Sequence, residues 1–78
     1  MSPKYKIGNI VKVFEYYNDM IVKDAYHGLI VDVACYKLPM ESSMKPIYIY
    51  HVLPSDVTPS RLGVQTAEEF AIEPIGVI

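Results

Sequence analysis

The chain has 78 residues, of which 51% are hydrophobic and 21% are charged, and its formal net charge is −2. This length and composition predict one soluble domain over residues 1–78, because domains usually need about 50 to 250 residues. The longest stretch without a charged side chain covers residues 46–55, about half of the roughly 20 residues that cross a bilayer. We therefore expect no membrane-spanning helix. The first residues also lack the apolar run of a secretory signal, which predicts an intracellular protein.

Cysteine and histidine are scarce in this chain. Cys35 is the single cysteine, and His27 and His51 are the two histidines, too few for an internal disulfide or a four-ligand zinc site. The four glycines are scattered rather than gathered in a phosphate-binding loop. We therefore expect no metal and no cofactor. Because so short a chain buries only about 60% of its unfolded surface, its stability must come from an economical all-β core or from association.

The first half of the chain is predicted to form two strands. Gly8 and Asn9 are a turn signal, and the alternation of apolar and polar residues that follows indicates a strand over residues 9–16. Residues 17–24 mix polar and apolar side chains, which predicts a hairpin loop. A second strand is expected over residues 28–37, with its odd-numbered apolar side chains, Leu29, Val31, Val33 and Cys35, on one face.

The second half is predicted to contain a third strand and a short helical turn. Residues 37–46 form an exposed connection, and residues 46–54 form a strand that is apolar on both faces. Thr66 and Glu69 match a capping box, which predicts a helical turn through Phe70 before a last short strand with Ile72 and Ile75. The expected core residues are Val11, Val13, Leu29, Val31, Val33 and Phe70.

Three segments carry a resemblance to a known fold. Residues 7–11 match an "x-G-D-x-V" opening strand with Asn9 in place of Asp, residues 28–33 match "G-x-V-x-x-V", and residues 69–75 match a turn into a terminal "E-P-I" strand. These segments resemble an SH3-like small β-barrel. The resemblance implies an all-β fold of about five antiparallel strands with one short helical turn near the C-terminus. The pattern is also similar to small uncharacterised proteins of tailed phages, particularly cyanophages, which implies a place in the host cytoplasm or the virion.

Catalysis is not predicted, because no motif brings a nucleophile, a base and an orienting group together. Cys35 lies in an apolar strand, which favours a buried small side chain over a nucleophile. Glu68 and Glu69 are adjacent carboxylates, explained by solvent exposure and by the capping box respectively. The expected protein is therefore not an enzyme.

The high tyrosine content is the most informative feature of the composition, since the chain has seven tyrosines and no tryptophan. Tyrosine is enriched at protein interfaces, although β-propensity alone also selects it in strands. Because the third strand is apolar on both faces, we expect one of its rows to be exposed and covered by a partner protein or a second copy. The expected partner-binding residues are Tyr48 and Tyr50, with Tyr16, Tyr17 and Ile47 as neighbours. An aromatic cage is an open alternative, built from Tyr16, Tyr17, Tyr26 or Tyr36.

Nucleic-acid binding is the alternative function. Small barrels bind nucleic acids with basic loops and stacked aromatic rings, and Lys4, Lys6 and Lys12 supply a small basic group beside tyrosines. However, residues 1–46 hold six basic and five acidic side chains, and residues 47–78 hold one basic and four acidic. Neither half forms a basic stripe. The sequence therefore predicts a non-catalytic protein–protein interaction module ahead of a nucleic-acid-binding barrel.

Overall fold

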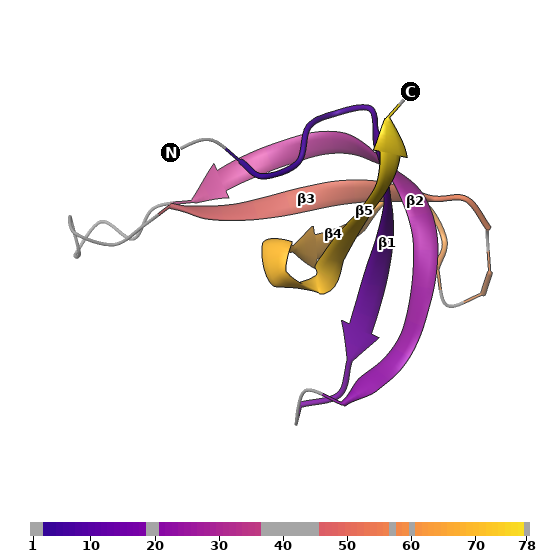
Figure 1. Ribbon diagram of the computed structural model, residues 1–78. Helices are drawn as coiled ribbons and strands as arrows, with labels where there is room; N and C mark the ends of the chain where they lie inside the picture. Colours follow the sequence, from indigo (N-terminus) through magenta and orange to yellow (C-terminus); the bar gives the residue numbers. More distant parts are fainter. Residues whose placement is uncertain (1–2, 19–20, 37–45, 57, 60, 78) are drawn as a thin grey trace.

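The computed structural model describes residues 3–18, 21–36, 46–56, 58–59 and 61–77, without the side chains of residues 76 and 77. Five antiparallel strands form one sheet in the order β4-β3-β2-β1-β5 (Figure 1). The elements are β1 (Asn9–Tyr16), β2 (Val22–Tyr36), β3 (Ile47–Pro54), β4 (Gln65–Glu68), the 3-10 turn η1 (Glu69–Ala71) and β5 (Ile72–Val77). The predicted all-β fold, with five strands and one short helical turn near the C-terminus, is confirmed. In the part of the chain described here, no helix is long and apolar enough to span a membrane.

The sheet is strongly curved but open. β4 and β5 are its two edge strands, and η1 connects them across the sheet while contacting β1 and β3 (Figure 1). No ladder joins β4 to β5 among the described residues, so hydrogen bonding does not close the predicted barrel completely.

β2 is the long bent strand that holds the two halves of the sheet together. Residues 22–29 pair with β1, and residues 28–36 pair with β3 (Figure 1). The predicted hairpin loop over residues 17–24 is therefore shorter, since β2 begins at Val22. Most of the predicted connection over residues 37–46 lies outside the described residues.

A β-bulge in β2 changes which side chains enter the core. Ile30 pairs with Val52 and Asp32 pairs with His51, so Val31 is the extra residue and the alternation of faces shifts at this point. Ile30 is fully buried, whereas Val31 is only partly buried. The expectation that Leu29 and Val31 form the core is therefore wrong.

Other core predictions are confirmed in part. Val11 and Val13 are buried, and Val33 packs against the core after the bulge. Cys35, expected to be buried, is exposed near the end of β2. The buried side chains that pack together as the hydrophobic core are Tyr5, Val11, Val13, Ile30, Tyr50, Val52, Ala67 and Ile72.

Tyr50 is the central side chain of this core. It is fully buried, and its ring lies edge-on to that of Tyr5 with 5.5 Å between centroids. Its hydroxyl accepts a hydrogen bond from the backbone N–H of Tyr5, and the Tyr5 hydroxyl donates to the carbonyl of Ile72. The segment before β1 therefore covers one end of the core, and both buried hydroxyl groups are paired.

β3 presents the opposite face to solvent from the one predicted. Tyr50 and Val52 point into the core, and Tyr48 packs against it. The outer row starts at Ile47 and ends at Leu53, which are 41% and 44% exposed. One apolar row does lie outside, as expected, but it does not contain Tyr48 and Tyr50.

The predicted capping box is also wrong. Thr66 lies in β4, where it pairs with His51, and the residue before η1, Glu68, makes no side-chain capping hydrogen bond. Pairing with the neighbouring strand has overridden the local helix-start signal. The 3-10 turn follows directly, and it buries Ala71 while leaving Phe70 58% exposed.

Candidate functional site

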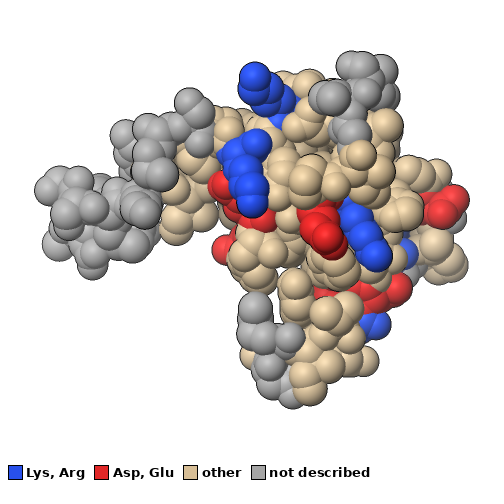
Figure 2. All heavy atoms as spheres, in the orientation of Figure 1, with Lys and Arg blue, Asp and Glu red and all other residues tan. Residues whose placement is uncertain are grey.

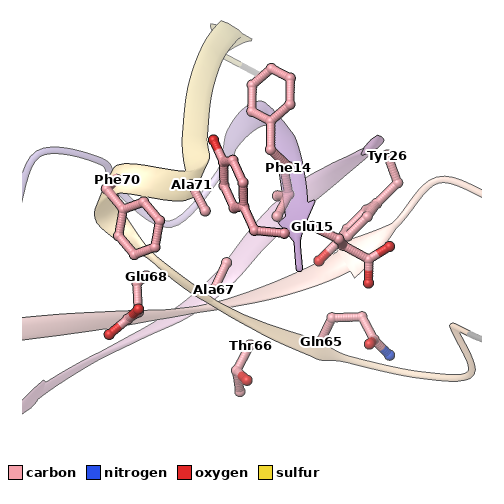
Figure 3. A pocket seen from close by; sticks show the side chains of 11 residues that line it. Phe14, Glu15, Tyr26, Gln65, Thr66, Ala67, Glu68, Phe70 and Ala71 are labelled. Carbon is pink, nitrogen blue, oxygen red and sulfur yellow. The ribbon is translucent and has the colours of Figure 1, made fainter. Parts of the chain in front are cut away.

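An aromatic pocket lies where the end of β1 meets β4 and η1 (Figure 3). We use this name for a hollow of about 280 Å³ with aromatic walls and carboxylates at its rim. Its floor contains the small side chains of Ala67 and Ala71, both buried. The lining residues are Val13, Phe14, Glu15, Tyr16, Tyr26, Gln65, Thr66, Ala67, Glu68, Phe70 and Ala71.

Three of its rings form a continuous aromatic strip. The centroid of Tyr16 lies 6.4 Å from that of Phe14 and 5.7 Å from that of Phe70. The pairing of β1 with β2 shifts register between Glu15 and Tyr16, and such an irregularity re-aims the side chains beside it. Successive residues of a 3-10 turn point about 120° apart, so burial of Ala71 turns Phe70 outward over the hollow.

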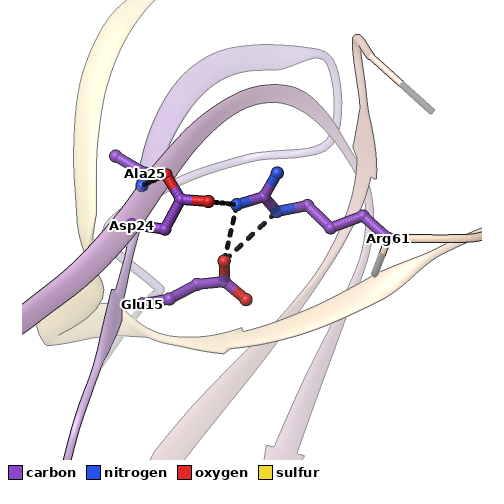
Figure 4. Close-up of polar contacts among 4 residues, drawn as sticks. All are labelled: Glu15, Asp24, Ala25 and Arg61. Atoms are coloured by element: carbon purple, nitrogen blue, oxygen red, sulfur yellow. Dashed lines mark hydrogen bonds and ion pairs between the residues drawn. The ribbon is translucent and has the colours of Figure 1, made fainter. Parts of the chain in front are cut away.

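Arg61 fixes the wall opposite Phe70. Its guanidinium carbon lies 4.7 Å from the ring centroid of Tyr26, and its Nη2 atom donates to Glu15 over 2.7 Å (Figure 4). The same nitrogen also donates to Asp24, whose other oxygen accepts the N–H of Ala25. Arg61 is only 7% exposed, so the loop between β3 and β4 is tied to the β1–β2 hairpin by a largely desolvated guanidinium.

The charges of this cluster shift each other's protonation equilibria. The N–H of Ala25 and the Arg61 guanidinium lower the pKa of Asp24, and the two carboxylates raise the pKa of Arg61. Burial, followed by the nearby charge of Glu15, raises the pKa of the Tyr26 hydroxyl. At neutral pH the lowered pKa keeps Asp24 ionised beside the Arg61 cation, and the raised pKa keeps the Tyr26 hydroxyl neutral.

A second hollow, of about 400 Å³, lies on the other side of this cluster. Tyr26 lines both hollows, whereas Arg61 lines only this one. Lys12, His27 and Asp56 also face it, so its charges are mixed in sign. It lacks the aromatic strip of the first hollow and gives no comparable binding chemistry.

The structure brings only one of the predicted partner-binding residues into the pocket. Tyr16 lines it, while Tyr17 is 56% exposed beyond the end of β1. Tyr50, expected at the surface, is fully buried, and Tyr48 packs against the core; Ile47 lies on the outer face of β3. The predicted set is therefore split between the pocket, the core and the outer face.

Sequence reasoning missed several residues that line the pocket. Phe70 was expected in the core, and Phe14 and Glu15 were not singled out. The cage alternative came closer, since Tyr16 and Tyr26 do line one pocket. A signal for this pocket is present in the sequence, because three aromatic residues cluster at the end of the first strand, in the run Phe14-Glu15-Tyr16-Tyr17.

The three lysines of the alternative function occupy different settings. Lys4 lies over the ring of Tyr5 and Lys12 over the ring of Phe14, each within 5.5 Å of the centroid. Lys6 is exposed at the turn before β1, and Glu73 pairs with Lys12 across the sheet. Figure 2 shows basic side chains at separate places, interspersed with acidic ones. The described surface on this face does not form a basic stripe.

Among the described residues, no three histidine, cysteine, aspartate or glutamate side chains gather into a potential metal site. No family model, curated protein or solved structure matches this chain. The expected resemblance to phage proteins therefore stays a prediction.

Proposed function

We propose that this protein is a non-catalytic protein-binding module whose aromatic pocket holds a segment of a partner protein. The observation that carries this proposal is Phe70, which is 58% exposed beside Tyr16 at the mouth of a hollow. Aromatic side chains that are left exposed around a concave surface are typical anchors of protein interfaces. The resemblance to phage proteins suggests a virion protein or a host protein as the partner.

The rigid setting of the pocket supports this proposal. Its rings come from the paired strands β1 and β2 and from η1, which is anchored by its buried residue Ala71, and the Arg61 guanidinium packs on the ring of Tyr26. A binding surface held in this way loses little conformational entropy when a partner docks. The outer face of β3 is also apolar, but no β3 residue lines either of the two hollows described above.

The proposal is tested by selecting binders from a random twelve-residue peptide library on the wild-type protein. Affinities are then measured by calorimetry for the wild type, Phe70→Ala and the milder Phe70→Leu. We expect Phe70→Ala to weaken binding at least about tenfold, because truncating an aromatic anchor commonly costs about 2 kcal/mol. Its melting temperature should stay close to that of the wild type, because Phe70 is exposed.

Leu62→Ala is the matched control, since Leu62 is 69% exposed and does not line the pocket. It should leave both binding and melting temperature unchanged. The proposal is wrong if the library yields no binder, or if folded Phe70→Ala and Phe70→Leu bind as tightly as the wild type.

A further inference from the structure

Every residue of β4 borders the aromatic pocket. Successive side chains of a strand point to opposite faces of a sheet, so a hollow on one face is lined by every second residue. All four residues of β4 nevertheless line this pocket, in the run Gln65-Thr66-Ala67-Glu68 (Figure 3). Ala67 pairs with buried Tyr50, so Thr66 and Glu68 belong to the outer face. The pocket therefore extends over the edge of β4, where the main chain is accessible.

This edge of β4 has no partner strand in the described part of the chain. β4 pairs with β3 on one side, without a register shift, and the sheet ends at its other side. No backbone hydrogen bond between other described segments reaches residues 65–68. The N–H and C=O groups that face the open edge are therefore unpaired donors and acceptors beside the pocket.

The neighbouring strand edges are less suited to pairing. β5 carries Pro74, which has no N–H to donate. The end of β1 also borders the pocket, beyond a ladder with β5 that begins at Val13, but its pairing with β2 shifts register between Glu15 and Tyr16. A bulge of this kind twists an edge away from regular pairing. β4 has neither a proline nor a register shift, so a further strand fits best on its edge.

We infer that the partner protein binds as an extended segment that adds a strand to the open edge of β4 and places one apolar side chain in the aromatic pocket. In this mode of recognition, main-chain hydrogen bonds supply affinity and a pocket selects the side chain. An extended segment with free amides complements the unpaired groups of β4, whereas a proline-rich segment lacks the donors.

The pocket specifies the side chain that anchors this segment. Its floor is formed by the small buried residues Ala67 and Ala71, and the rings of Tyr16 and Phe70 stand beside them. An aliphatic or aromatic side chain buries its surface against these rings without leaving a polar group unpaired. This inference rests on the proposed function and names the conformation and chemistry of the partner segment.

The first test uses the peptides selected on the wild-type protein. Each amide N–H of a binding peptide is replaced singly by an N-methyl group, which removes one donor and leaves the side chains in place. We expect affinity losses of about tenfold at every second position of the bound segment, because alternate amides of an added strand face β4. The positions between them carry the same modification and are the matched controls, with expected losses of less than about twofold.

The second test measures amide hydrogen exchange of the protein by NMR. In the free protein, pairing with β3 should protect alternate amides of residues 65–68 and leave the others in fast exchange. Peptide binding should slow the fast amides at least about tenfold. The amides of β5 are the control, since they belong to the other edge of the sheet and should keep their rates.

The possible outcomes separate this inference from the proposed function. If the peptides need Phe70 but show no alternating N-methyl losses, or leave the fast β4 amides unprotected, the inference is wrong and the proposed function stands. Selection of proline-rich peptides would overturn it in the same way. If rising protein concentration alone protects the β4 amides, the occupant is a second copy and the inference is wrong. If no peptide binds, both are wrong.

Discussion

Gly28 lies where β2 passes from β1 to β3, opposite Pro54. A Cβ atom at this position would lie 2.5 Å from Cγ1 of Val52 and 2.7 Å from the carbonyl oxygen of Leu53. The second contact is with backbone, which cannot rotate away as a side chain does. Glycine is therefore required here because of a close approach between strands, at a position that the sequence pattern identified only as the start of a strand.

We expect Gly28→Ala to reduce the free energy of unfolding by about 1–3 kcal/mol, the usual cost of forcing extra volume into a packed site. Urea denaturation measures this change. His27→Ala alters an exposed neighbour in the same strand and should stay within about 0.5 kcal/mol of the wild type. An unchanged denaturation midpoint for Gly28→Ala would show that β2 and β3 are farther apart at this point.

At the scale of elements, the bulge in β2 decides which residues form the core. A regular strand puts Ile30 and Asp32 on one face, which would bury a carboxylate beside Tyr50. With Val31 as the extra residue, Asp32 instead pairs with His51 on the outer face and Val33 packs against the core. Neither glycine nor proline marks the bulge in the sequence, so the alternation rule had no signal from which to predict it.

The bulge predicts an order of stability for two neighbouring substitutions. Ile30→Ala should cost about 2–5 kcal/mol, because Ile30 is fully buried and its truncation leaves a cavity. Val31→Ala should cost less than half as much, because Val31 is only partly buried. Denaturant unfolding of both variants tests which residue faces the core, and the opposite order would mean that Val31 rather than Ile30 lies there.

At the scale of the whole molecule, Arg61 connects parts that are distant in the sequence. It bonds to Glu15 and Asp24, 46 and 37 positions away, and so joins the loop between β3 and β4 to the first hairpin. Arg61 is also the last basic residue of the chain. The same contact positions Tyr26 and Glu15 in the aromatic pocket, so the stability of the fold and the shape of the site share one side chain.

This contact predicts an acid-sensitive contribution to stability. Because the pKa of Asp24 is lowered from its ordinary value of 3.8 in the folded state, the unfolded chain takes up its proton first as the pH falls. The contribution of Asp24 to the free energy of unfolding is therefore complete above about pH 3.8, and it is lost as the pH falls through the lower pKa of the folded state. Asp24→Asn should melt at a lower temperature than the wild type at pH 7, and the difference should shrink at pH 2.5.

Thermal melts across this pH range test the linkage, with Asp56→Asn as the control at a second exposed aspartate near Arg61. The difference in melting temperature between Asp56→Asn and the wild type should not shrink between pH 7 and pH 2.5. If the difference in melting temperature between Asp24→Asn and the wild type stays constant down to pH 2.5, the acid sensitivity does not come from Asp24.

Local patterns determined much of the fold. The alternation after the Gly8-Asn9 turn predicted β1 with its observed bounds, and the run of β-branched and aromatic residues before Pro54 predicted β3. Gly8 has a φ of 97°, and the Asn9 side chain accepts the N–H of Lys6, which is the chemistry a turn signal requires. These features depend on residues close in sequence, so the sequence by itself was enough to predict them.

Only the tertiary structure decided the faces of the strands and the place of the pocket. An apolar row on each side of β3 leaves the choice of core face open, and the packing of Tyr50 against Tyr5, 45 positions away, settles it. Thr66 follows a helix-start pattern but pairs with β3 instead. The pocket likewise joins residues 14–16 to residues 65–71, because burial and strand pairing act between segments that no local pattern relates.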